Sequence, residues 1–298
     1  MQAQRDRPAS SELLTLIRQL ASEPDGHGIT PESGLADIGF DSLACAEFAA
    51  LVQERYGLDI ADGEVTRVTT AGQLATVVDG AAAAGLRQDG FPVGLGRFRG
   101  PAKRAITSVM RWWFELDIRN AERMPAEGHV VMCMNHESSL DIPVAVTASP
   151  RAITFMAKKE LFHRPVPARF LHELGGFSVE RGAFDLRAVE VALAVLEGGE
   201  VLGMYPEGTR TPGVLLPFLP GAAWLALKTG ASLLPVAIHG TAAAMPKGST
   251  VPNRGRVRIS FGKAVAVEQE ADPAVRREEA VRLSSELRDA VEGMLAAG

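Results

Sequence analysis

A glycine-rich segment at residues 85–100 separates two parts of the chain that follow different hydrophobic patterns. The segment holds five glycines and one proline without a clean periodicity, which is typical of a flexible linker. A chain of 298 residues is long enough for about two domains. The sequence therefore predicts two domains, residues 1–84 and residues 101–298, joined by the linker.

The first 84 residues are predicted to form a small antiparallel bundle of four helices. Their apolar residues recur at helical spacing, and the central segment is apolar on more than one face, as expected of a helix inside a bundle. The four predicted elements are a helix that begins at Ser10 or Ser11, a helix over 43–56, a short turn near 62–65 and a helix over about 70–84.

After residue 100, short apolar runs alternate with helical patterns. This alternation predicts an α/β domain with a central mixed, largely parallel sheet. The clearest helix lies between an N-cap at Asp185 and a stop at Gly198, and a terminal helix is predicted over 273–297. The predicted strands are 130–134, 153–157, 177–179, 201–205, 233–238 and 257–261.

The net charge of -5 is distributed unevenly. Residues 1–90 hold six arginines, no lysine and fourteen acidic residues, whereas residues 91–298 hold 25 basic and 22 acidic residues. An acidic first part and a mildly basic second part fit two domains that dock by charge. Acidic helical modules are also common for other reasons, so charge alone leaves docking open.

Several classes of protein are disfavoured by the composition. Cys45 and Cys133 fall in different predicted domains, which argues against a disulfide framework and favours a reducing compartment. The first residues lack the apolar core of a signal peptide, and no apolar run approaches the ~20 residues of a membrane span. We expect a cytoplasmic protein, soluble or peripheral at the inner membrane face, with no metal site and no nucleic-acid partner.

One predicted helix, over 102–116, is amphipathic. Its apolar residues Ile106, Val109, Met110 and Trp113 recur at helical spacing. With Trp112, Trp113 and Phe114 as anchors, this helix fits a membrane interface. It fits equally a helix that packs on the sheet of its own domain.

Ser42 lies after a loop and at the start of the predicted helix over 43–56, within the run Gly39-Phe40-Asp41-Ser42-Leu43. A serine at this place is also a good N-cap. However, the spacing of the first helix, Leu35 and the acidic residues Glu47 and Glu54 agree with a wider pattern. The whole segment resembles the acyl carrier protein family.

That resemblance implies that a phosphopantetheinyl transferase attaches 4′-phosphopantetheine to Ser42, with Asp41 and Leu43 completing the attachment site. The thiol of the arm would hold an acyl group as a thioester. Asp41 and Glu47 would help to dock basic surfaces of partner proteins.

A second candidate site is the run Asn135-His136-Glu137-Ser138-Ser139-Leu140-Asp141, directly after a predicted strand. A histidine there can act as a general base, and a carboxylate can hold its imidazole in the required tautomer. Five residues along an ideal helix leave about 140° between side chains. His136 and Asp141 therefore meet only if His136 lies on the loop and Asp141 in the first helical turn. Ser138-x-x-Asp141 also fits a capping box, and spacing alone does not separate the two interpretations.

Three further blocks follow in order, and the set resembles the glycerol-phosphate and lysophosphatidate acyltransferase superfamily. Asn135, His136 and Asp141 match the first block of that superfamily. The other blocks are a glycine-rich stretch over 175–181 that ends in Arg181, the run Tyr205-Pro206-Glu207-Gly208-Thr209-Arg210, and a proline within the apolar strand at 234–238. Together the blocks cover about residues 101–270.

The resemblance implies an O-acyltransferase in which His136 takes the proton of an acceptor hydroxyl and Asp141 stabilises the imidazolium. Arg181 and Arg210 would bind a phosphate through forked donors, and Gly208 would let the backbone approach that anion.

Other residues of these blocks are assigned less sharply. Thr209 would also contact the substrate. Glu207 would orient the donor or the acceptor, or form an ion pair with Arg210. Lys158 or Lys159 would contact the oxyanion or phosphate, or form a solvated pair. Cys133 is expected to be a buried structural residue. His163 and His239 are also expected to be structural.

The sequence departs from the superfamily at two places. Phe218-Leu219-Pro220-Gly221 stands where the family often has Phe-Lys-x-Gly, and Glu180 adds negative charge beside Arg181. Both departures weaken the case for a simple phosphoglycerol acceptor.

The resulting hypothesis is an enzyme that moves an acyl group from its own carrier domain, or that of another copy, to a hydroxyl. The acceptor would be a phosphorylated glycerol, a lysophospholipid or a specialised metabolite. The alternatives are a carrier and docking protein with a silent second domain, and a thioesterase that releases the acyl group to water.

Overall fold

The computed structural model describes residues 10–21, 28–35, 37–40, 42–56, 68–84, 99–158, 176–179, 186–246, 248–249 and 251–297. The chain divides into two compact units. One comprises Met1–Pro92 and Val179–Val191, and the other comprises Val93–Ser178 and Ala192–Gly298. The division passes through α8 (Leu186–Glu197).

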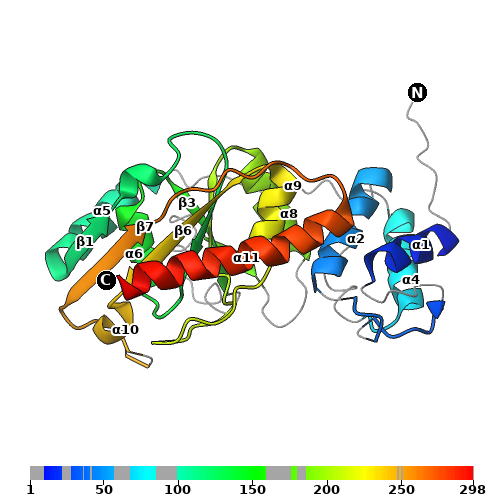
Figure 1. Cartoon of the computed structure of the whole chain (residues 1–298), viewed down its shortest axis with the longest axis horizontal. Helices are drawn as coiled ribbons and strands as arrows, with labels where there is room; N and C mark the ends of the chain where they lie inside the picture. The colour runs from blue at the N-terminus through cyan, green and yellow to red at the C-terminus, as the bar shows by residue number, and fades with distance from the viewer. Residues whose placement is uncertain are drawn as a thin grey trace. The chain divides into compact units, whose positions relative to one another are not determined.

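The first unit contains three described helices, α1 (Ser10–Leu20), α2 (Ser42–Tyr56) and α4 (Ala71–Ala84) (Figure 1). Their apolar faces form one core, in which the rings of Phe40 and Phe48 meet edge to face with centroids 6.1 Å apart. The predicted turn at 62–65 lies outside the described residues. Three of the four predicted helices are therefore described.

The second unit is an α/β domain around a seven-stranded sheet with the order β1-β7-β6-β2-β5-β3-β4. The register is described for five strand pairs, of which only β6 with β7 is antiparallel. The prediction of a mixed, largely parallel sheet is therefore confirmed. Its elements are α5 (Arg99–Trp113), β1 (Glu115–Arg119), η2 (Ala121–Arg123), β2 (Val130–Met134), α6 (Asp141–Ala148), β3 (Ile153–Lys158), β4 (Gly176–Val179), β5 (Val201–Met204), α9 (Gly221–Thr229), β6 (Ser232–His239), α10 (Thr241–Ala244), β7 (Arg256–Phe261) and α11 (Pro273–Ala296).

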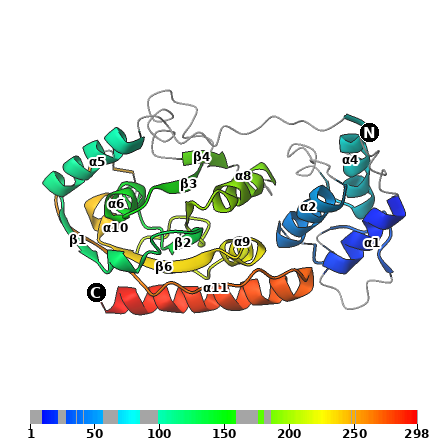
Figure 2. The same cartoon turned by 90° about the horizontal axis from the view of Figure 1, so that it is seen from above.

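Helices cover the central sheet. The long helix α11 packs on α9 and along β6, and α9 contacts β2 (Figure 2). The helix α5 packs on α6, which contacts β7. The strand β2 lies between β6 and β5 and is buried at all five positions, as is typical of a central strand. The first candidate block follows directly after the carboxyl end of this strand.

The predicted boundaries of the first helix of this unit were wrong, and one strand was not predicted. The helix expected over 102–116 begins at Arg99, inside the predicted linker, and ends at Trp113. Its predicted last residue, Leu116, belongs instead to the unpredicted edge strand β1. The five residues of β1 alternate between charged and apolar, which is the pattern of a half-buried strand, and they pair in parallel with β7.

The structure bears out one interpretation of this helix, packing on its own domain. Ile106, Met110 and Phe114 are buried in the core of the second unit, and Trp113 donates its Nε1–H to the carbonyl of Pro252 at 3.1 Å. Trp112 remains exposed. The helix therefore packs on its own domain, and two of the three expected anchors are engaged there. Within the described parts of the chain, no helix combines the length and apolar character needed to cross a bilayer.

Candidate active site

Asn135 fixes the chain where it leaves β2. Its buried side-chain amide donates to the carbonyl of Ile238 at 2.9 Å and accepts from the Ile238 amide at 2.8 Å. Because β6 is a neighbour of β2 in the sheet, this pair of bonds extends the sheet pairing by one residue. The role of Asn135 in the first block is thus to set the exit direction of the loop that carries His136.

His136 and Asp141 lie in direct contact. His136 is on the loop and α6 begins at Asp141, as the spacing requires. Nδ1 of His136 lies 2.7 Å from Oδ2 of Asp141, and their side chains are only 6% and 0% exposed. A buried carboxylate this close to an imidazole orients the ring.

The Asp141 carboxylate receives four hydrogen bonds. Besides Nδ1 of His136, the amides of Glu137 and Ser138 donate to Oδ2 at 2.8 Å each, and the Thr241 hydroxyl donates to Oδ1 at 2.6 Å. A buried charge is tolerated when donors surround it in this way. Because the ionised carboxylate only accepts, this network assigns the imidazole proton to Nδ1 and leaves Nε2 as the basic nitrogen.

One of the two hydrogen bonds of a capping box is formed. Oδ2 of Asp141 accepts the Ser138 amide, as a capping box requires. The Ser138 hydroxyl, however, donates to the carbonyl of Met245 at 3.0 Å, and the Asp141 amide bonds to the carbonyl of Ser138. The same carboxylate therefore holds both the loop and the imidazole, so the two interpretations are compatible.

Glu207 supports the loop from the end of β5. Its buried carboxylate accepts the His136 amide at 2.7 Å on Oε1, and the Thr211 hydroxyl at 2.6 Å and the Leu216 amide at 3.0 Å on Oε2. The Thr211 amide in turn donates to the carbonyl of His136 at 2.9 Å. The carboxylate thus joins two loops. The ion pair with Arg210 that the sequence left open is not formed between these two described side chains.

The remaining residues of the third block lie beside the His136 loop. Gly208 has a φ of 69°, in the left-handed region where glycine is unstrained. Thr209 and Arg210 are exposed, and Arg210 donates to the Ser139 hydroxyl at 2.7 Å. Because β2 and β5 are parallel neighbours, the first and third blocks both follow the carboxyl ends of strands and lie next to each other. This end of the sheet is where α/β domains commonly bind ligands.

Tyr205 contacts the imidazole, although its side chain was not predicted as a site residue. Its ring is stacked on His136 with centroids 4.1 Å apart and planes inclined by 22°. Burial, followed by the Asp141 carboxylate, raises the pKa of the Tyr205 hydroxyl well above its ordinary value, with the Arg210 charge acting in the opposite direction. The contact depends on the pairing of β5 with β2, for which the sequence carries no local signal.

Cys133 is buried within β2, as predicted, and burial raises the pKa of its thiol to about 12. A thiol held in its neutral form is a poor nucleophile.

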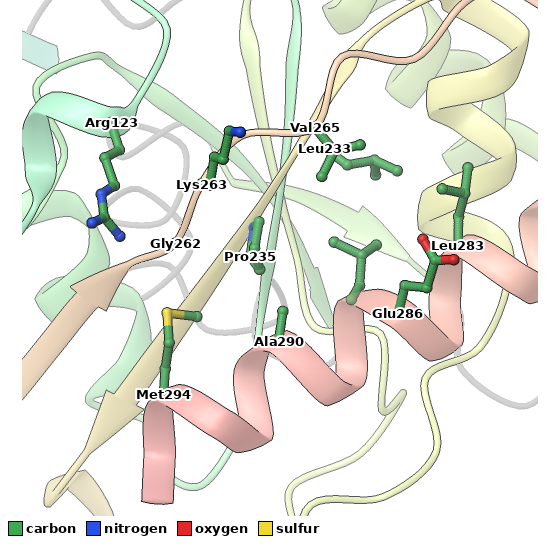
Figure 3. A pocket seen from close by; sticks show the side chains of 11 residues that line it. Arg123, Leu233, Pro235, Gly262, Lys263, Val265, Leu283, Glu286, Ala290 and Met294 are labelled. Atoms are coloured by element: carbon green, nitrogen blue, oxygen red, sulfur yellow. The ribbon is translucent and has the colours of Figure 1, made fainter. Parts of the chain in front are cut away.

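Pockets in the described part of the second unit include one of about 300 Å³ with a mixed polar and apolar lining, which includes Asn135, Glu137, Glu207 and His239. Burial, and then the nearby Asp141 carboxylate, raise the pKa of Glu137, against backbone hydrogen bonds from Gly213 and Ala242. A mostly apolar pocket of about 360 Å³ lies between α11, β6 and the segment that follows β7 (Figure 3).

Several predicted site residues are described only in part. Lys158 ends β3, but its side chain lies outside the described residues, as do Lys159 and Arg181. Asp41 also lies outside them, and Ser42 and Leu43 are described by their backbone alone. These roles remain predictions.

The backbone at Ser42 fits a phosphorylated arm. Ser42 is the first residue of the 15-residue helix α2, and no acidic residue stands in the first turn of that helix. The amino end of a helix carries a partial positive charge and free N–H groups, which favour a phosphate. Glu47 was expected to help dock basic partner surfaces. Its side chain is only 3% exposed, so it presents little surface to a partner.

Asp141→Asn is expected to lower the rate of acyl transfer by about 10³–10⁴-fold, because the amide removes the charge that holds the Nδ1 proton and stabilises the imidazolium. Steady-state kinetics of the full chain measure the loss. Asp117→Asn is the matched control. Asp117 lies on the edge strand β1, three strands from β2 in the sheet order, and accepts a hydrogen bond from Arg258 of β7. Equal rates in the Asp141 variant and the parent would contradict the assigned tautomer.

Comparison with known families defines the class of the protein. Residues 115–239 match a family model described as Acyltransferase, and residues 11–78 match one described as Phosphopantetheine attachment site. The first match contains His136, Asp141 and Glu207, and the second contains Ser42. The protein is therefore an acyltransferase joined to a phosphopantetheine-attachment domain.

Individual relatives narrow the class. The chain is 30% identical over 147 residues to the 1-acyl-sn-glycerol-3-phosphate acyltransferase of Bacillus subtilis, covering 49% of this chain and 71% of the relative. It is 30% identical over 160 residues to the chloroplastic enzyme BAT2 of Brassica napus, covering 51% of this chain but only 46% of that one. The chain belongs to the 1-acyl-sn-glycerol-3-phosphate acyltransferase family.

A solved structure supports the fold. The 1-acyl-sn-glycerophosphate acyltransferase PlsC of Thermotoga maritima superposes with a TM-score of 0.51 at 24% identity, covering 85% of this chain and 95% of that one.

Proposed function

We propose that this protein transfers an acyl group from a 4′-phosphopantetheine thioester on Ser42 to a hydroxyl of a phosphorylated glycerol, a lysophospholipid or a phosphorylated specialised metabolite. The observation that carries the proposal is the buried His136–Asp141 pair, in a chain that also has a phosphopantetheine-attachment domain. The donor is the carrier domain of the same chain or of another copy, after a phosphopantetheinyl transferase has modified Ser42.

The chemistry follows from the assigned tautomer. When bound, phosphopantetheine supplies a thiol that carries the acyl chain as an activated thioester. Nε2 of His136 takes the proton of the acceptor hydroxyl as the hydroxyl oxygen bonds to the thioester carbonyl carbon. The C–S bond then breaks, and the imidazolium returns the proton to the leaving sulfur. Asp141 stabilises the imidazolium between these steps.

The transfer is direct, without an acyl-enzyme. The thioester is already activated, so the protein needs a base and a positioned acceptor but no nucleophile of its own. Cys133, the one cysteine near the site in sequence, is fully buried with its pKa raised to about 12.

The acceptor is proposed to carry a phosphate or another anionic group. Arg210 is exposed beside the His136 loop, where its guanidinium can bind an oxyanion. The names of the relatives point to 1-acyl-sn-glycerol 3-phosphate. Leu219, however, stands where the superfamily often has lysine. It is 58% exposed, and a Cβ placed on Gly208 would lie 3.1 Å from its Cδ1. An apolar side chain at this place favours an acceptor with an apolar group near its anion.

The test is to load Ser42 with a labelled acyl group and to supply water alone, glycerol 3-phosphate, 1-acyl-sn-glycerol 3-phosphate, or the unphosphorylated 1-acylglycerol. We expect an ester that appears only with a hydroxyl acceptor and faster with a phosphorylated one. Release of free acid in water alone at the same rate would instead support a thioesterase. An acyl group that stays on Ser42 with every acceptor would support a silent second domain.

A further inference from the structure

The hydroxyl of Tyr205 has no hydrogen-bond partner in the described parts of the chain. Its oxygen is buried, and among described side chains it shares this state only with Oγ1 of Thr147. Buried polar groups without a partner are destabilising, and native proteins have few of them. A phenylalanine would make the same ring contacts without this cost, so the fold gains nothing from the hydroxyl.

The position of the ring is not arbitrary. Tyr205 follows β5 directly, and its ring lies flat on the His136 imidazole at 4.1 Å. The hydroxyl is therefore carried by a ring in direct contact with His136, the base that handles the reacting proton. The raised pKa of Tyr205 keeps the hydroxyl protonated, so it is available as a neutral donor near neutral pH.

The reacting atoms offer this donor a partner. As the acceptor oxygen attacks, negative charge develops on the carbonyl oxygen of the thioester, and a donor aimed at that oxygen accelerates the reaction. The His136 side chain is 6% exposed, the Tyr205 side chain is partly buried, and the hydroxyl oxygen of Tyr205 is buried. An acceptor that reaches Nε2 comes close to the Tyr205 ring, because that ring stacks on the imidazole.

We propose that the Tyr205 hydroxyl is a further catalytic group, which donates a hydrogen bond to the thioester carbonyl oxygen as it becomes an oxyanion. The assignment rests on the proposed function, because it requires acyl transfer at His136.

The test is Tyr205→Phe in the full chain, which keeps the ring and removes only the hydroxyl. Acyl-phosphopantetheine serves as a soluble donor and 1-acyl-sn-glycerol 3-phosphate as the acceptor. We expect kcat to fall by about 10²-fold, with the acceptor KM unchanged, because the contact forms only in the transition state. The thermal unfolding midpoint should stay equal or rise, because a buried hydroxyl without a partner is removed.

Thr147→Val is the matched control. Thr147 carries the other buried hydroxyl without a partner, in the last turn of α6, and six residues of helix place it about 9 Å along the axis from Asp141. This variant should raise the unfolding midpoint or leave it equal, and should transfer at the rate of the parent. A similar loss of kcat in both variants would show a general packing effect and would overturn the proposal.

Three further outcomes overturn it. An unchanged kcat in Tyr205→Phe would show an idle hydroxyl, and a raised acceptor KM with unchanged kcat would place the hydroxyl on the acceptor. A lowered unfolding midpoint would show that the hydroxyl has an internal partner. If His136→Ala transferred as fast as the parent, the proposed function itself would fail, and this result is separate from any effect of Tyr205.

Discussion

His136→Ala is expected to lower acyl transfer by about 10³-fold, within the range of about 10²–10⁴ typical of a lost general base. Nε2 is the one imidazole nitrogen left basic by the Asp141 network, and the alanine leaves the acceptor proton without a recipient. The measurement uses the full chain with acyl-phosphopantetheine and 1-acyl-sn-glycerol 3-phosphate, so that it reports the chemistry independently of the loading of Ser42.

His129→Ala is the control for this variant. His129 and His136 flank the same strand, β2, at opposite ends, and His129 contacts the sheet through its backbone carbonyl, which the substitution retains. The control should transfer at the rate of the parent. Comparable rates for His136→Ala and the parent would exclude His136 as the base.

Ser42→Ala is expected to abolish attachment of phosphopantetheine completely, because the hydroxyl is the only atom of that residue able to form the phosphodiester. Intact-protein mass spectrometry after incubation with a phosphopantetheinyl transferase and coenzyme A measures the result. Transfer from soluble acyl-phosphopantetheine should persist, since His136 and Asp141 are unchanged.

Ser10→Ala provides the comparison, because Ser10 is likewise the first residue of a helix in the first unit, α1. It should be modified as fully as the parent. A Ser42 variant that still gains the mass of the arm would show that the attachment site is elsewhere. The Ser42 variant should therefore lose attachment of the arm, whereas the His136 variant should lose acyl transfer.

The contact between His136 and Asp141 could be predicted because it is local. The two residues are five positions apart, and the strand before them and the helix after them leave one geometry in which they meet. The apolar runs of the buried strands, such as β2 and β6, were predicted for a similar reason. A central strand of a parallel sheet is apolar at nearly every position.

The other contacts of the site depend on pairing across the sheet. Thr241 reaches Asp141 across 100 residues, and Glu207 reaches the His136 amide across 71. No local pattern marks these partners, so the sequence suggested a substrate contact or an ion pair for Glu207 and no role for Thr241 or Tyr205. The edge strand β1 was missed because only continuous apolar runs were taken as strands, whereas its five residues alternate between charged and apolar.

The most direct test of the account follows one acyl group through one turnover. Full-length protein is loaded at Ser42 with a labelled acyl chain, mixed with 1-acyl-sn-glycerol 3-phosphate, and sampled by intact-protein mass spectrometry while the lipid product is measured. We expect the acyl mass to leave the parent as an equal amount of ester and to remain on His136→Ala. Loss of the acyl group from both proteins at the same rate, or its recovery as free acid, would exclude acyl transfer from Ser42 by His136.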